Sequence, residues 1–104
     1  MAWIILFFAG ISEVAWAVGL KYADGFTKPL PSALTLFCLV ISFLLLGLSL
    51  RTLPLGVAYG VWVGIGAVGT AIAGIVFFHE SVSLLKLASI GLILLGVIGL
   101  KLAS

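Results

Sequence analysis

Four long apolar segments, separated by short stretches that contain charged residues, Pro or Gly, dominate this sequence of 104 residues. We expect them at residues 3–22, 31–50, 55–78 and 83–102. Each is about as long as the roughly 20 residues that a helix needs to cross a bilayer. Because 64% of the residues are hydrophobic and only 8% are charged, so short a chain cannot bury its apolar side chains in a water-facing core. The sequence therefore predicts an all-α membrane protein, with one four-helix transmembrane domain over residues 1–104.

Turn-forming residues mark the ends of these segments. Gly25 can adopt the left-handed conformation that ends a helix. Pro31 and Pro54 cannot lie inside a helix without breaking it, so they mark the starts of the second and third segments. Because the connectors are short, successive helices must run antiparallel. The N-terminus, residues 51–56 and the C-terminus therefore share one side of the membrane, here called side A, and the other two connectors share side B.

The basic residues are divided almost equally between the two sides. Side A carries Arg51 and Lys101, whereas side B carries Lys21, Lys28 and Lys86. The positive-inside rule orients a membrane protein through this asymmetry, and a difference of one charge is too small to choose an orientation. We therefore expect insertion in both orientations and an antiparallel, dual-topology homodimer, because four helices enclose little space by themselves. Such scattered charges give no basic patch, so we expect no nucleic-acid partner.

Glu13 is the only charged residue well inside a predicted span. A carboxylate there costs from about 2.5 to more than about 10 kcal/mol, and such residues usually mark an ion or proton pathway. With a rise of about 1.5 Å per residue, Glu13 lies roughly 15 Å from side A if the span starts at Trp3, which is half of a core about 30 Å thick. A midplane residue keeps its depth when the chain is inverted, so the two carboxylates of an antiparallel dimer would share one site. The alternative is a protonated Glu that only joins two helices.

A cation suits the surroundings that the sequence predicts for this carboxylate. Five residues lie at helical spacing from Glu13 or at a depth that lets them reach it: Gly10, Trp16, Ser42, Tyr59 and Trp62. Carboxylate oxygens, tryptophan faces and hydroxyl oxygens all interact favourably with positive charge. A planar guanidinium matches the two carboxylate oxygens and is more weakly hydrated than an ammonium ion. The alternatives are lipid anchoring for the tryptophans and backbone hydrogen bonds for the hydroxyls.

A carboxylate that holds either a proton or a cation can exchange one for the other, so we expect antiport. Gly64 and Gly66 predict a bend in the third segment, which would open the site to alternate sides; close helix packing is the alternative. The fourth segment carries Gly91, Gly96 and Gly99 without deep polar residues, which favours a dimer contact.

No catalytic or metal-binding pattern is present. The sequence lacks a cluster of metal ligands, a phosphate-binding loop and a nucleophile paired with a base. We therefore expect no metal, no cofactor and no enzymatic activity. The single cysteine, Cys38, cannot form an intrachain disulfide. His79 and Glu80, in the connector before the fourth segment, are expected to be solvated without a chemical role.

Several motifs resemble those of the small multidrug resistance family along essentially the whole chain. They are Gly10-x-x-Glu13-Val14, Lys21-Tyr22-x-x-Gly25-Phe26-Thr27, Pro54-x-Gly56-x-Ala58-Tyr59-x-x-Trp62 and Gly64-x-Gly66. Trp16 stands three residues after Glu13, where the multidrug branch typically has a small residue, and in this the chain is similar to the guanidinium-exporter branch.

The resemblance implies an antiparallel, dual-topology homodimer in the inner membrane that exports guanidinium ion, and small substituted guanidines, in exchange for protons. It also implies that Glu13, Trp16, Ser42, Tyr59 and Trp62 form the site, with Glu13 binding proton and substrate in competition.

Three other functions stay open at this point. A multidrug exporter of the same fold would carry bulky aromatic or quaternary cations, although Trp16 favours a tighter site. A small dual-topology channel, such as a fluoride channel, would have a similar length and charge balance, although a midplane carboxylate repels anions. A non-transporting assembly subunit would not need Glu13.

Overall fold

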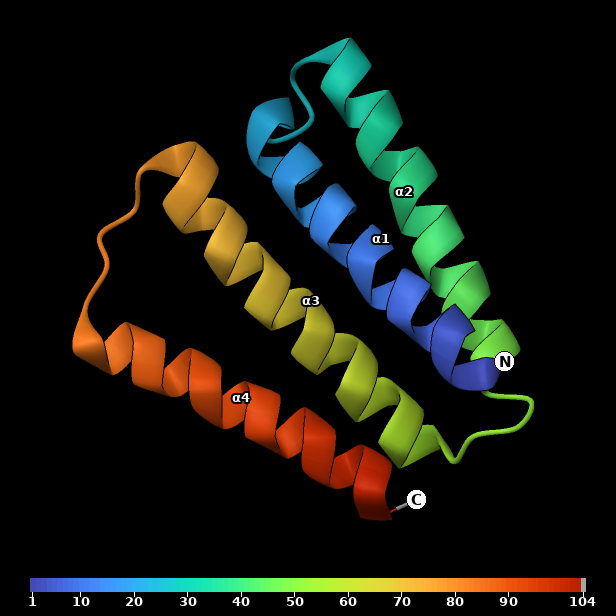
Figure 1. Ribbon diagram of the computed structural model, residues 1–104. Coiled ribbons are helices and arrows are strands. Elements are labelled where there is room, and N and C mark those ends of the chain that lie inside the picture. The colour runs from blue at the N-terminus through green and yellow to red at the C-terminus, as the bar shows by residue number, and fades with distance from the viewer. Residues whose placement is uncertain (104) are drawn as a thin grey trace.

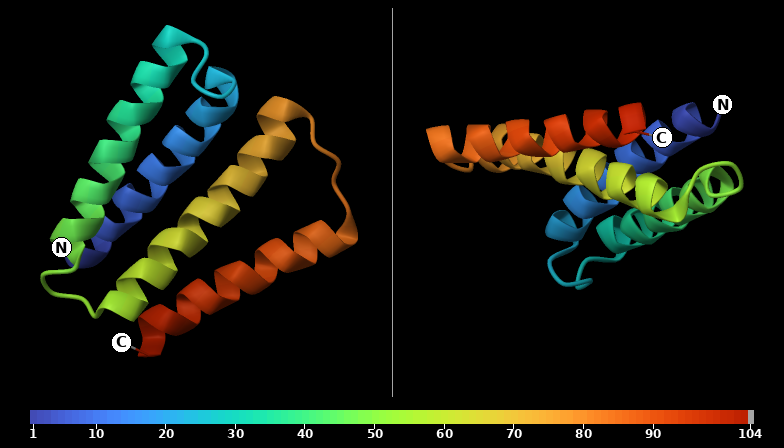
Figure 2. Two further views of the ribbon diagram at one scale, coloured as in Figure 1. Left: turned by 180° about the vertical axis from the view of Figure 1, so that it is seen from behind. Right: turned by 90° about the horizontal axis from the view of Figure 1, so that it is seen from below.

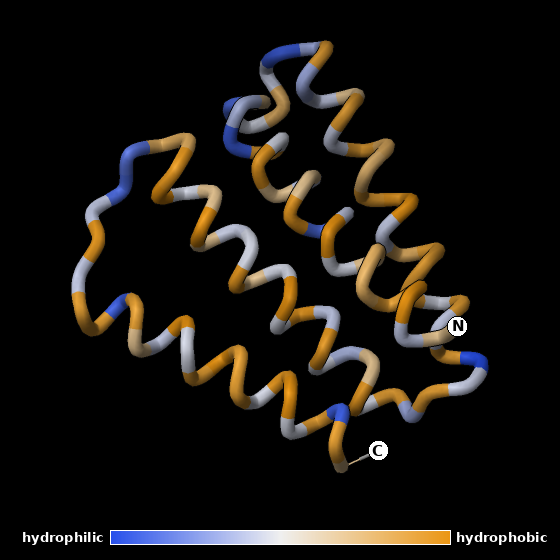
Figure 3. Tube along the Cα trace, in the orientation of Figure 1, coloured by the Kyte–Doolittle hydropathy of each residue, from blue (hydrophilic) through white to orange (hydrophobic). Residues whose placement is uncertain are grey.

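The computed structural model describes residues 1–103 as four helices (Figure 1). They are α1 (Ala2–Ala23), α2 (Pro29–Ser49), α3 (Leu55–Phe78) and α4 (Leu84–Ala103), and the described part of the chain contains no strand. Each helix is long and apolar enough to cross a membrane. Figure 3 shows hydrophilic residues mainly at the connectors and helix ends, with predominantly hydrophobic helices between them. The prediction of an all-α protein with four transmembrane helices is confirmed.

The two side-B connectors begin with residues in the left-handed conformation. After α1, Asp24 and Gly25 have φ angles of 48° and 70°. After α3, His79 has a φ of 53°, and the N–H of Glu80 donates to the Gly74 carbonyl over 3.2 Å. A left-handed residue ends a helix by turning the chain back over the last carbonyl groups. These connectors therefore stop α1 and α3 at the membrane surface.

The second helix begins earlier than the predicted span. It starts at Pro29 and passes through Pro31, which was expected to mark its start. Both prolines lie in the first turn, where the N–H groups have no partner within the helix, so the missing donor costs no hydrogen bond. The fourth helix begins at Leu84, and the backbone N–H of Lys86 donates to the Ser83 hydroxyl over 3.1 Å.

The helices form a flat array in the order α2, α1, α3, α4. The chain measures 40 × 34 × 17 Å, so it is far thinner in one direction than in the other two. Helix α1 packs between α2 and α3, whereas α4 packs along α3. Figure 2 shows that α3 and α4 lie close together at side A and diverge toward their connector at side B. The best packed residues are therefore in α1, α2 and the first half of α3: Leu6, Ala9, Leu46, Ala58, Val61 and Trp62.

Glycines bring α3 close to both of its neighbours. A Cβ atom on Gly10 of α1 would lie 2.5 Å from Cγ2 and 2.7 Å from Cβ of Ile65, so the Ile65 side chain already occupies this space. In the same way Gly64 faces Val97 of α4. Small residues at helix contacts are the usual means of association in membranes, because lipid offers no hydrophobic drive for helices to pack. Close packing of complementary helix surfaces therefore holds these helices together.

The glycines of α4 face open space in the single chain. A Cβ on Gly91, Gly96 or Gly99 would meet no atom within 4 Å, and no described residue of α4 is buried. Their role in a dimer contact stays a prediction.

The contact at Gly10 makes a stability test. We expect Gly10→Ala to lower the free energy of unfolding by about 1–3 kcal/mol, because the added methyl group meets the Cβ of Ile65 and forces α1 and α3 apart. Gly47→Ala in α2 is the matched control, since a Cβ there would meet nothing within 4 Å. Thermal unfolding of the two variants in detergent measures the difference. Equal stability would contradict the packing of α1 on α3.

Candidate functional site

Two buried hydrogen bonds join three helices. The indole N–H of Trp62 in α3 donates to the Ser42 hydroxyl in α2 over 3.0 Å, and the same hydroxyl donates to the Ala9 carbonyl in α1 over 2.8 Å. Ser42 is completely buried and Trp62 is only 4% exposed. For Ser42, the alternative considered in the sequence analysis was a hydrogen bond from the hydroxyl to the backbone, and the bond to the Ala9 carbonyl is of this kind. Lipid anchoring does not describe Trp62, because its side chain lies inside the chain.

Aromatic rings surround Trp62 on two sides. The ring centroid of Tyr59 lies 5.6 Å from that of Trp62, and the Phe43 ring meets it edge-on at 5.1 Å. Such distances are favourable for aromatic pairs. Tyr59 itself is 53% exposed. The aromatic group therefore continues from the interior of the chain to its outer surface. Phe43 was not predicted, because its sequence position does not distinguish it from the other six phenylalanines.

The carboxyl group of Glu13 lies directly against the backbone of α3. A Cβ atom on Gly66 would overlap this carboxyl group, so a larger residue there would force the Glu13 side chain to move. The Oε1 atom is buried and has no hydrogen-bond partner among residues 1–103. Most buried side-chain oxygens in proteins have such a partner, and a buried oxygen without one is costly. Glu13 therefore holds an unused acceptor that a proton or a ligand could occupy.

The indole N–H of Trp16 is also buried without a partner in the described part of the chain. Trp16 follows Glu13 by three residues, so the two side chains share one face of α1. One face of one helix thus presents both an unused acceptor and an unused donor. This pair, the Ser42–Trp62 bond and Tyr59 are the polar features that the structure assigns to the predicted site residues.

The predicted glycines serve helix packing in the single chain. Gly10 was expected to leave room beside the carboxylate, but Ile65 fills this space. Gly64 contacts Val97 and Gly66 contacts Glu13. Helix α3 is continuous through both positions, so the bend at Gly64 and Gly66 stays a prediction.

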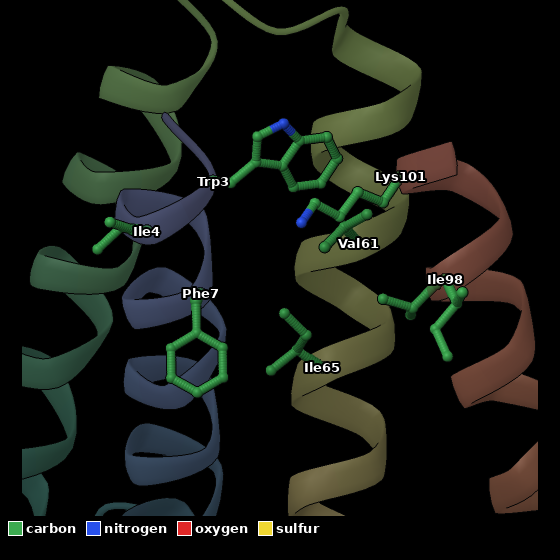
Figure 4. A pocket seen from close by; sticks show the side chains of 8 residues that line it. Trp3, Ile4, Phe7, Val61, Ile65, Ile98 and Lys101 are labelled. Atoms are coloured by element: carbon green, nitrogen blue, oxygen red, sulfur yellow. The ribbon is translucent and has the colours of Figure 1, made fainter. Parts of the chain in front are cut away.

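A separate crevice of about 360 Å³ opens between α1, α3 and α4 near side A. Figure 4 shows apolar side chains around it, among them Phe7, Ile65 and Ile98, with Lys101 at its rim. The Lys101 ammonium lies 5.6 Å from the centroid of the Trp3 ring. No lining residue is acidic. This crevice therefore does not suit a cation, and none of the predicted site residues lines it.

The buried serines provide a test of the hydrogen bonds. We expect Ser42→Ala to lower the free energy of unfolding by about 1–3 kcal/mol, because the Trp62 N–H loses its acceptor inside the chain. Ser49→Ala is the control: Ser49 is equally buried, but its hydroxyl only donates to the Leu46 carbonyl, which also accepts the Leu50 N–H. Thermal unfolding measures the stabilities. A larger loss at Ser49 would contradict the assigned bonds.

Comparisons with known proteins cover essentially the whole chain. Residues 1–93 match the family model described as Small Multidrug Resistance protein. A protein of Yersinia pestis named "Guanidinium exporter" is 59% identical over 104 residues, and the match covers 100% of both chains. Proteins of the same name from Proteus vulgaris and Salmonella typhimurium are each 53% identical over 104 residues, which is all of this chain and 100% and 99% of theirs.

This family match and the four apolar helices of membrane-spanning length lead to one conclusion. The chain is a multi-pass inner-membrane protein that belongs to the small multidrug resistance family.

Proposed function

We propose that this protein exports guanidinium ion across the inner membrane in exchange for protons. Relatives named "Guanidinium exporter" that are 53–59% identical over the full chain support the substrate. The observation that supports exchange with protons is that the buried Glu13 Oε1 has no hydrogen-bond partner among residues 1–103. An acceptor held in this state is free for one positively charged ligand at a time.

The chemistry of the proposed site matches a flat cation. The carboxylate of Glu13 would accept two N–H bonds from guanidinium in a fork, the strongest arrangement for this pair. The faces of Trp16 and Trp62 carry negative charge density that favours a cation above them. The hydrogen bond to Ser42 holds Trp62 in place, so its ring need not be ordered when the ligand binds.

Exchange follows if proton and guanidinium compete for Glu13. A protonated carboxyl group has lost the negative charge that guanidinium requires, and a carboxylate that holds guanidinium has no free oxygen for the proton. The protein then carries either ligand across, but not both together. Export of guanidinium is driven by the proton gradient provided that the protein changes its open side mainly when the site is occupied.

A second copy in the opposite orientation would complete the site. Glu13 lies near the middle of α1, which extends from Ala2 to Ala23, so inversion of the chain keeps its depth. Tyr59 is exposed in the single chain and α4 has no buried residue there, so both are available for such a partner. In an antiparallel homodimer the two Glu13 carboxyl groups would meet at one level and share a single substrate. Alternating access would then exchange the conformations of the two copies.

Removal of the acid tests the proposal directly. In liposomes, a guanidinium gradient should drive proton movement through the native protein, and Glu13→Gln should reduce this flux to the background of empty liposomes, because the amide cannot release a proton. An internal pH-sensitive dye measures the flux. Asp24→Asn is the control: Asp24 is an exposed carboxylate in the connector after α1, and its loss should leave the flux unchanged. Native flux in Glu13→Gln would overturn the proposed function.

The choice of substrate is a separate prediction. Guanidinium should drive proton movement, whereas a bulky quaternary phosphonium should not, because Trp16 occupies space on the face of α1 that carries Glu13. The same liposomes and dye compare the two cations at equal concentrations. Proton movement with the phosphonium alone would show a multidrug exporter instead.

A further inference from the structure

A second cavity lies at the side-B ends of α1 and α3, toward the membrane surface from Glu13. Its volume is about 190 Å³, and its lining includes Ala17 and Lys21 of α1, Thr70 of α3 and Glu80 of the following connector. Ala17 follows Glu13 by four residues and so lies one helical turn further toward side B on the same face. The cavity therefore begins one turn away from the proposed site.

Three oxygen-bearing groups lie along one face of α3. The Glu13 carboxyl group rests on Gly66, and the Glu80 carboxyl group rests on Gly74. Thr70 lies midway between these two glycines. Each step of four residues returns to the same face of a helix and advances about 6 Å along its axis. Thr70 thus lies between the buried carboxyl group and the outer one on this face of α3.

The cavity has the size and polarity to hold water. Water occupies about 30 Å³ per molecule in the liquid, so about six molecules fit, and each needs polar partners. Lys21, Thr70 and Glu80 supply an ammonium, a hydroxyl and a carboxylate. The outer end reaches the solution, because the Glu80 side chain is 51% exposed.

The charges around this cavity do not favour an organic cation such as guanidinium. The Glu80 carboxylate is already paired with the Lys86 ammonium at 3.3 Å, and Lys21 adds a second positive charge to the wall, with its ammonium 5.9 Å from the centroid of the Phe78 ring. His79, the residue before Glu80, is exposed. The cavity thus has no unpaired negative charge for an organic cation.

We propose that this cavity is the route by which protons pass between Glu13 and the solution at side B, with the Thr70 hydroxyl as the inner relay and Glu80 as the outer acid. The proposal rests on the proton exchange proposed above. On release, the Glu13 carboxyl group gives its proton to a water between it and Thr70, this water passes a proton to the Thr70 oxygen, and Thr70 gives its own proton to a cavity water. The water chain passes one proton to the Glu80 carboxylate, which releases it to the solution, so Thr70 and the waters end unchanged.

In an antiparallel pair the routes of the two copies would lead to opposite membrane surfaces, because side B of one copy faces opposite to side B of its partner, and coupled exchange requires that only the route on the open side conducts protons at a time. Protons and guanidinium would then reach the shared site by different paths.

Two transport measurements separate a proton route from a structural role. The first is proton movement driven by a guanidinium gradient, and the second is exchange of labelled for unlabelled guanidinium at equal pH, which transfers no proton. Thr70→Val keeps the shape of the side chain and removes the hydroxyl, and Glu80→Gln keeps the contacts on Gly74 and Lys86 and removes the acid. We expect each to slow the proton-coupled flux about tenfold and to leave guanidinium exchange unchanged. Thr70→Ser, which retains the hydroxyl, should restore the native flux.

Each other outcome is decisive. Loss of both activities together in Glu80→Gln would show that this region acts in folding or movement, and native proton flux in both variants would show that protons take another path. Either result overturns the route and leaves the proposed exporter intact. Persistence of guanidinium exchange shows that the variants are folded. If Thr70→Val does not fold, Glu80→Gln alone tests the route, because Glu80 is exposed and its replacement should not affect folding. Absence of proton flux in the native protein would overturn the proposed function, and the route with it, before any variant is compared.

Discussion

The absence of water in the bilayer core is the constraint on which the rest of this structure depends. Each backbone N–H and C=O group must find a partner within the chain, which only helices or closed barrels provide. The described part of the chain forms four helices, and its residues in the left-handed backbone conformation lie in the connectors. Polar side chains within the helices are then few, and each one without a partner is conspicuous. The unused oxygen of Glu13 is one of these few polar atoms without a partner.

Close packing at glycines determines where the polar groups meet. The Glu13 carboxyl group occupies the space that a side chain on Gly66 would need, and the Glu80 carboxyl group has the same relation to Gly74. In both cases a glycine of α3 accommodates an acid from another part of the chain. Glycines that look alike in the sequence thus have different surroundings, since those of α4 face open space.

The hydrogen bonds around Ser42 show how packing converts isolated residues into a rigid group. Trp62, Ser42 and the Ala9 carbonyl come from three helices, and α1 lies between the other two. Because both bonds are buried, they are protected from competition with water, and loss of one partner leaves another group unsatisfied. The two bonds therefore hold the Trp62 ring in one orientation.

Sequence alone determined the helical class and the number of spans, because length and hydropathy are local properties. With the rise of about 1.5 Å per residue, it also predicts a midplane depth for Glu13 and compatible depths for Ser42, Tyr59 and Trp62. Only the tertiary structure decided that Ser42 bonds to the Ala9 carbonyl, that Ile65 fills the space at Gly10 and that Glu80 folds back onto Gly74. These contacts depend on the rotation of each helix about its axis and on its distance from its neighbours. Both follow from how the surfaces of all the helices fit together, which no single segment encodes.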